Sequence, residues 1–162
     1  MNRTRYIFIA LFSMFIIVTV ISWLFNTVYI PGNGVSLYDD DPSGDAYYSL
    51  MSMFGSASSG DLYTALTYVS VIIGPILALI VVGTMKAPMR VVWKVLFIIY
   101  LLVNLCHSFF AFFIMVFDIF GPAKYLTVAG WIPIGLNTLS AIFLFVIAVS
   151  KGAARGVLKA RN

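Results

Sequence analysis

Four long apolar stretches run through this chain, and they restrict its fold more than any other feature. They cover approximately residues 6–30, 62–82, 91–117 and 125–150. A helix needs about 20 apolar residues to cross a hydrocarbon core of roughly 30 Å. Of the 162 residues, 62% are hydrophobic and only 10% are charged, which is more apolar surface than a soluble domain of this size can bury. We therefore expect a single-domain, all-α membrane protein with four transmembrane helices in an up-down bundle.

The basic residues are divided unevenly between the two sides of these stretches. All six Asp residues fall on one side together with Lys124. The other nine basic residues share the opposite side: Arg3, Arg5, Lys86, Arg90, Lys94, Lys151, Arg155, Lys159 and Arg161. Because basic loops are retained in the cytoplasm, we expect the N- and C-termini to be cytoplasmic. We predict a multi-pass protein of a prokaryotic cytoplasmic (inner) membrane.

The predicted first outer loop, residues 31–61, carries most of the negative charge. Its acidic run contains Asp39, Asp40, Asp41 and Asp45. Part of this run fits the start of an EF-hand calcium loop, in which carboxylates alternate along the chain before a glycine. The twelfth position of that loop is Leu50, where calcium binding requires a bidentate Glu. Calcium binding therefore remains an alternative to a simpler role, in which the run is the solvated cap of a helix.

Apolar residues recur at helical spacing directly after the acidic run. Tyr47, Leu50, Met51 and Phe54 follow the i, i+3, i+4, i+7 pattern. We expect a short interfacial helix over residues 46–54, lying on the outer membrane surface. Its aromatic and apolar face is a candidate docking face for another protein.

Polar residues in the middle of the apolar spans are candidates for a functional site, because ionisable groups are costly at membrane depth. Gly74 and Pro75 predict a helix kink in the second span. The features lie at similar depth and could line a polar site between helices, although interhelical hydrogen bonding alone would also explain them. The remaining candidates, in the third and fourth spans, are Asn104, Cys106, His107, Ser108, Asn137 and Ser140.

His107 is the only histidine in the chain. We expect it to be neutral and to point into the bundle or into a partner, because a charged imidazolium is costly inside a membrane. It could supply one haem ligand, but the second would have to come from a partner chain or a Met. Zinc would need more ligands than His107 and Cys106. We therefore expect no cofactor and no bound metal, with haem and calcium as the alternatives left open.

The C-terminal segment, residues 151–162, is basic. Lys151, Arg155 and Lys159 are spaced to form one face of a helix. Beside a membrane, such a face binds anionic lipid headgroups, at about 1 kcal/mol per basic residue. The run is short and adjoins a membrane span, so nucleic acid is not an expected partner.

Three classes of function fit these features. The first is a non-catalytic integral membrane subunit, an interaction or assembly component of a larger membrane complex; a homo-oligomer is also compatible. The second is a small oligomeric transporter or channel that uses the polar site around His107 and Asn137. The third is a cofactor-binding electron-transfer subunit. No catalytic motif is present, and we do not expect an enzyme.

One short segment also resembles a known group of proteins. The sequence DAYYSLMSMFG, residues 45–55, resembles a segment in inner-membrane proteins of type IVB secretion and conjugation systems. The resemblance implies an inner-membrane component of such a system. It is confined to these eleven residues, and no residue takes a role from it.

Overall fold

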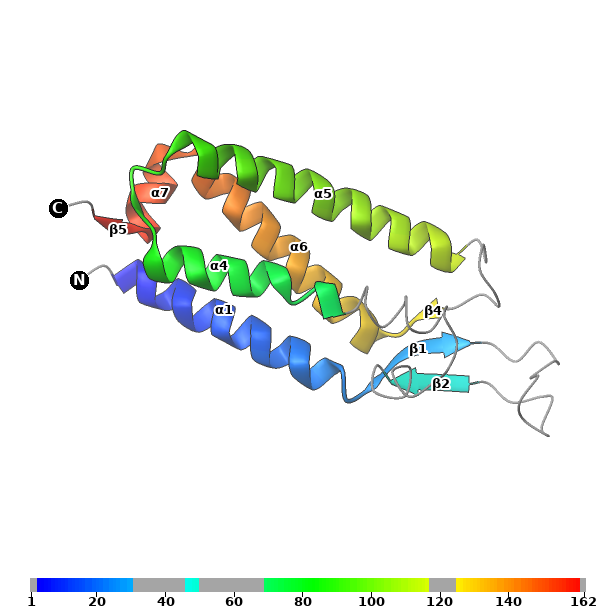
Figure 1. The fold of residues 1–162 in the computed structure, drawn as a ribbon. Helices are drawn as coiled ribbons and strands as arrows, with labels where there is room; N and C mark the ends of the chain where they lie inside the picture. The colour runs from blue at the N-terminus through cyan, green and yellow to red at the C-terminus, as the bar shows by residue number, and fades with distance from the viewer. Residues whose placement is uncertain (1–2, 31–45, 50–68, 117–124, 161–162) are drawn as a thin grey trace.

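The computed structural model describes residues 3–30, 46–49, 69–116 and 125–160, and their side chains over 3–25, 49, 69–106 and 126–159. This part of the chain is mostly helical, and its long helices extend between the two ends of the molecule (Figure 1). α1 and α6 are each long and apolar enough to cross a membrane. The described helices are α1 (Arg3–Ser22), α4 (Ile73–Thr84), α5 (Val91–Val116), α6 (Val128–Val149) and α7 (Lys151–Val157).

The helices α1, α4 and α6 pack against one another, and α5 packs chiefly on α6. Aromatic rings form much of the contact between α1 and α6: the ring centroids of Phe8 and Phe12 lie 4.9 Å and 4.8 Å from that of Phe143. Small and branched side chains of α4 complete this core, because they follow one face of that helix. The buried α4 residues include Ala78, Val81 and Val82.

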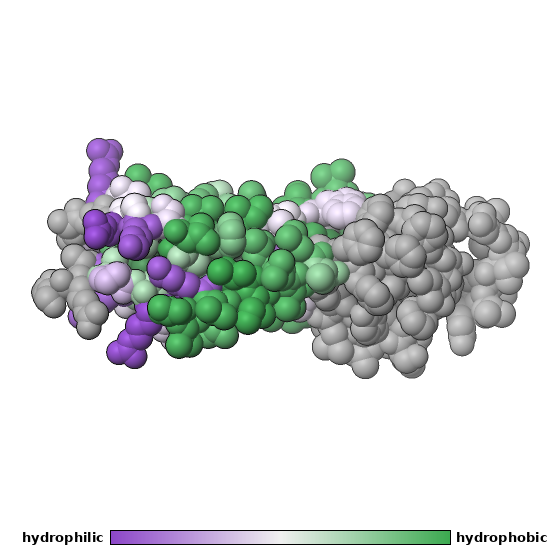
Figure 2. All heavy atoms as spheres, turned by 90° about the horizontal axis from the view of Figure 1, so that it is seen from above, coloured by the Kyte–Doolittle hydropathy of each residue, from purple (hydrophilic) through white to green (hydrophobic). Residues whose placement is uncertain are grey.

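The two ends of the bundle have different character. The start of α1, the end of α4, the start of α5 and α7 gather at one end, where both termini also lie (Figure 1). Figure 2 shows the most hydrophilic residues at this end and a largely hydrophobic surface along the helices. All six Asp residues lie outside the described ranges. The basic side chains at this end therefore have no carboxylate partner within the part of the chain described.

A small antiparallel sheet lies at the opposite end (Figure 1). It contains β1 (Asn26–Ile30), β2 (Ala46–Ser49) and β4 (Tyr125–Leu126), in the order β2-β1-β4. In the central strand, Tyr29 lies opposite Tyr47 on one side and Tyr125 on the other. The sheet thus joins the segments that follow α1 and precede α6.

This sheet corrects two expectations drawn from the sequence. The first span was expected to be helical from 6 to 30, but α1 ends at Ser22 and residues 26–30 form β1. The predicted interfacial helix over 46–54 is wrong where the structure describes it, because Ala46–Ser49 is a strand. A short isolated helix is only marginally stable, and aromatic and β-branched residues favour a strand once a partner strand is available. Leu50, Met51 and Phe54 lie outside the described residues.

The C-terminal segment packs onto the bundle and does not form one continuous basic helix. α7 ends at Val157, and β5 (Lys159–Ala160) pairs in parallel with β3 (Lys86–Ala87). The backbone N–H of Lys159 donates to the carbonyl of Met85 at 3.1 Å. The spacing predicted one helix face that contains Lys151, Arg155 and Lys159. Lys159 lies beyond the end of α7 and does not share that face. Ala154 and Val157 of α7 and the following residue, Leu158, are buried and belong to the hydrophobic core of the bundle.

Arg5 connects the start of α1 to the end of α4. Its Nε donates to the carbonyl of Val82 at 2.8 Å, and one terminal nitrogen donates to the carbonyl of Gly83 at 2.7 Å. The last carbonyls of a helix have no partner within it and carry the negative end of the helix dipole. The guanidinium satisfies both requirements at once, because its donors form a rigid fork.

We predict that Arg5→Ala destabilises the protein by about 1–2 kcal/mol, because it removes charge-assisted hydrogen bonds to half-buried carbonyls. The measurement is thermal unfolding of the protein in mild detergent. Arg3→Ala is the matched control, since Arg3 is an exposed residue in the same helical turn. Equal losses of stability in the two variants would contradict the role given to Arg5.

Candidate functional site

The polar residues that the structure brings together lie where α4 begins. The preceding helical residues, 69–70, are separated from α4 by a turn at Val71 and Ile72. In that turn the N–H of Ile72 donates to the carbonyl of Val69, three residues back, as in a tighter 3₁₀ turn. Gly74 and Pro75 are buried in the first turn of α4. The interruption falls at the position where the Gly-Pro pair predicts a kink.

Asn137 supplies the acceptor that the beginning of α4 requires. The first N–H groups of a helix have no partner within it, and an unpaired one is costly away from water. The N–H of Gly74 donates to Oδ1 of Asn137, in α6, at 3.0 Å. Pro75 has no N–H and therefore needs no acceptor. A side chain of α6 thus caps α4 across the bundle.

The same amide oxygen also connects α5 to this group. The hydroxyl of Tyr100 donates to Oδ1 of Asn137 at 3.1 Å. The buried side chain of Asn104 lies beside Tyr100, one turn further along α5. We call Gly74, Tyr100, Asn104 and Asn137 the polar cluster. It joins three helices through one buried amide, and Asn104 and Asn137 are only 5% and 3% exposed.

Gly74 is required by the close approach of α4 to α6. A Cβ at this position would lie 2.2 Å from Oδ1 of Asn137 and 3.0 Å from the backbone carbonyl oxygen of the same residue. The hydroxyl oxygen of Tyr100 would also be only 3.0 Å away. Any larger residue would therefore separate α4 from α6 and break the hydrogen bond that caps α4.

One acceptor of the polar cluster has no partner among the described residues. Oδ1 of Asn104 is buried and has no hydrogen-bond partner within the described part of the chain. Buried polar atoms usually have a partner, so this oxygen is the point at which the cluster can accept a further donor. As described, the cluster offers amide and hydroxyl hydrogen bonds, which can orient a polar group or hold helices together.

The other predicted site residues are placed differently. Ser140 is fully buried, but its hydroxyl donates to the carbonyl of Leu136 at 2.8 Å within α6. Cys106 is exposed and does not join the polar cluster. His107 and Ser108 continue α5, but their side chains lie outside the described residues, so the orientation of His107 stays a prediction. The predicted docking face does not form as a helix face at Tyr47, which lies in β2, and its other residues lie outside the described ranges. The calcium alternative at Asp39, Asp40, Asp41 and Asp45 also lies outside them.

Two residues that connect helices, Tyr100 in the polar cluster and Arg5 at the end of α4, were not among the predicted site residues. Tyr100 lies one helical turn before Asn104, so the i, i+4 spacing of polar residues within an apolar span was the available signal. Arg5 was used only to assign the orientation. Its hydrogen bonds to α4 depend on which helix lies beside α1, and no local pattern in the sequence carries that information.

Comparison with protein-family models, curated protein sequences and solved structures finds no significant match to this chain. The function therefore has to be argued from the geometry of the bundle and from the chemistry of its surface.

We predict that Gly74→Ala destabilises the protein by about 1–3 kcal/mol, the cost typical of overpacking a close-packed site. The measurement is again thermal unfolding in detergent. Gly83→Ala, in the same helix, is the control, because a Cβ there meets nothing within 4 Å. The control should be neutral or slightly stabilising, since Ala favours a helix more than Gly does. If Gly74→Ala is as stable as Gly83→Ala, α4 and α6 do not approach each other closely at Gly74.

Proposed function

We propose that this chain is a non-catalytic integral membrane subunit that serves as an interaction or assembly component of a larger membrane complex. It would cross the membrane four times. The four spans would be α1, then the interrupted segment whose second part is α4, then α5, and finally α6. The end that carries α7 and both termini would face the cytoplasm, because basic residues flank every helix end there. The polar cluster would then lie inside the membrane and hold the helices together.

The lateral surface of the bundle supports a membrane location. Large apolar side chains are exposed along each long helix, such as Ile17 in α1, Ile80 in α4 and Leu139 in α6, each more than half exposed. Soluble monomers rarely expose continuous apolar surface. Trp93 lies in the first turn of α5 at the basic end, and Trp131 lies in the first turn of α6 at the other end, as in the aromatic belts of membrane proteins.

One observation carries the proposed role as an interaction subunit: α5 packs chiefly on α6 and leaves most of its apolar surface uncovered. Within its described side chains, eight aliphatic residues and Trp93 are exposed. A helix attached along one face offers the others to lipid or to a neighbouring subunit, and close packing between helices stabilises association inside a membrane. The eight exposed aliphatic residues are Val91, Val92, Val95, Leu96, Ile99, Leu102, Val103 and Leu105.

The geometry of the polar cluster supports packing more strongly than transport. Oδ1 of Asn137 accepts from both a backbone N–H and a phenol hydroxyl. Interhelical hydrogen bonds of this kind contribute about 0.6 kcal/mol on average and at most about 2 kcal/mol in membranes. They are sufficient to set the arrangement of three helices without a bound solute.

A small oligomeric transporter or channel is the second candidate, and a specific observation favours it. The unused Oδ1 of Asn104 lies in a cluster beside an interrupted helix, and transporters commonly bind substrates at interrupted helices near the middle of the membrane. In that case the cluster would accept a polar solute or an ion, and His107 would be close to its path.

We predict that the tagged, full-length protein, extracted gently from its native membranes, elutes as a colourless complex with other subunits at fixed stoichiometry. The measurement is size-exclusion chromatography with mass analysis and an absorption spectrum. Leu102→Arg should release those subunits, because it places a charge on the exposed face of α5. The control is Ile17→Arg on the exposed face of α1. A colourless assembly of this chain alone would favour the transporter, and a haem absorption band would favour the electron-transfer class.

The proposed topology predicts which residues a membrane-impermeant thiol reagent can reach in sealed vesicles. In a Cys106→Ser background, Ser43→Cys in the acidic segment and Arg155→Cys in α7 should react from opposite sides. Arg155 is suitable because it is exposed, whereas the neighbouring Ala154 is only 5% exposed. Reaction of both residues from the same side would exclude the four-span topology.

A further inference from the structure

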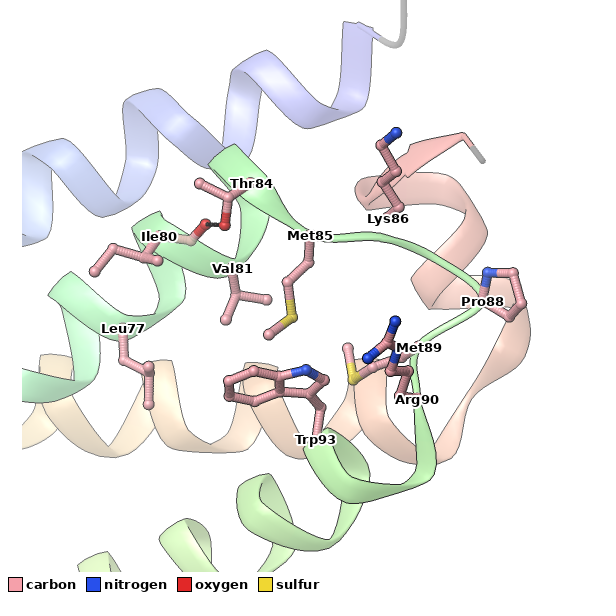
Figure 3. Close-up of a pocket in the computed structure, with 10 residues that line it drawn as sticks. All are labelled: Leu77, Ile80, Val81, Thr84, Met85, Lys86, Pro88, Met89, Arg90 and Trp93. Atoms are coloured by element: carbon pink, nitrogen blue, oxygen red, sulfur yellow. Dashed lines mark hydrogen bonds between the residues drawn. The ribbon is translucent and has the colours of Figure 1, made fainter. Parts of the chain in front are cut away.

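A groove opens at the basic end, between the second half of α4, the connection that follows it and the first turn of α5. Its volume is about 500 Å³, which lies within the range of small-molecule sites. Figure 3 shows that Met85, Met89 and Trp93 approach one another at its centre. Leu77 and Ile80 extend the apolar lining along α4, away from the loop.

The apolar lining of this groove is partly uncovered. Ile80 is 52% exposed and Trp93 is 41% exposed. Trp93 is held at this place by Phe97, whose ring centroid lies 6.2 Å from its own. The groove thus runs from an apolar side surface of the bundle to the hydrophilic end, which is the path followed by a lipid chain and its headgroup.

Positive charge is concentrated at the loop end of the groove. Arg90 directly precedes α5, and Figure 3 shows its guanidinium beside Met89, extending toward Met85. Lys86 belongs to the same rim, although its side chain extends outward. The first N–H groups of α5 add the positive end of a helix dipole to this rim. No carboxylate neutralises these charges within the described part of the chain.

We infer that this groove binds one anionic phospholipid of the cytoplasmic leaflet. The phosphate would lie at Arg90 and the start of α5, and the acyl chain would lie along Trp93, Ile80 and Leu77. A soluble phosphate compound would leave the apolar part of the groove unfilled, and a purely apolar molecule would leave Arg90 without an anion. The inference rests on the proposed function, because it requires this end of the bundle to lie at the inner membrane surface.

The site differs from the headgroup contacts expected at the C-terminal segment. Lys151 and Arg155 are exposed on α7 and can attract anionic lipids in general through charge. The groove adds an apolar channel beside a single arginine, and therefore predicts a lipid held in one position.

The test uses the full-length protein in lipid vesicles, with Trp23→Phe and Trp131→Phe so that Trp93 is the only fluorophore of its kind. The vesicles contain phosphatidylcholine with a fixed fraction of either brominated phosphatidylglycerol or brominated phosphatidylcholine, whose bromines quench a neighbouring Trp. We expect the anionic lipid to occupy the site roughly fivefold more strongly, the factor that corresponds to about 1 kcal/mol for one basic residue at a membrane surface. Arg90→Gln should abolish this preference, whereas Lys151→Gln, at the same end but outside the groove, should preserve it.

Two further outcomes would overturn the site. The first is an anionic preference that survives Arg90→Gln, and the second is full reversal of the preference by millimolar glycerol 3-phosphate, which would make it a soluble-phosphate site. Native mass spectrometry of unsubstituted protein provides a second measurement: a retained phosphatidylglycerol molecule should disappear in Arg90→Gln. A variant with Trp131 alone separates failure of the site from failure of the proposed function. If neither brominated lipid quenches Trp131 or Trp93, the chain is not embedded in the bilayer at all.

Discussion

A buried backbone N–H at the start of a helix must find an acceptor, and in this protein Oδ1 of Asn137 provides it for Gly74. The requirement is strict because Gly74 and Asn137 are buried, and an unpaired N–H is costly away from water. Once α6 provides that acceptor, α4 has to approach it closely, and only glycine leaves the space. The hydroxyl of Tyr100 then joins the same oxygen and connects α5 to the pair. The arrangement of three helices thus depends on one side-chain amide.

At the basic end, backbone carbonyls at the end of α4 also need partners, and there the donors come from an arginine side chain. Arg5 satisfies carbonyls at the end of α4, and the C-terminal segment pairs with the loop that follows them. Both termini are therefore tied to the α4–α5 connection. Lys86 takes part in this pairing through its backbone, whereas Arg90 contributes to neither set of contacts. Both residues border a groove whose apolar lining is partly exposed. Charged residues that the fold does not use are the natural candidates for binding a ligand.

Much of the helical part of the fold could be predicted from the sequence, because long apolar segments allow few alternatives once the backbone must satisfy its own hydrogen bonds. The range of α5, Val91–Val116, differs by one residue from the predicted span. The errors include Asn26–Ile30 and Ala46–Ser49, which pair with each other as strands, and Lys159, which pairs with Lys86 in a second sheet. Neither apolar content nor spacing within one segment can reveal a partner strand elsewhere in the chain, so both predict a helix at these segments.

Local composition is enough to predict that the chain is mostly helical, that α1 and α6 are apolar enough to cross a membrane, and which polar residues stand out against that background. Each of these follows from local composition, since hydrophobicity and charge act residue by residue. Helix packing, in contrast, determines that Asn137 caps α4, that Arg5 donates to Val82 and Gly83, and that Lys159 pairs with Lys86. These contacts join residues more than sixty positions apart. Their geometry depends on which helices pack side by side, and a local pattern does not contain that choice.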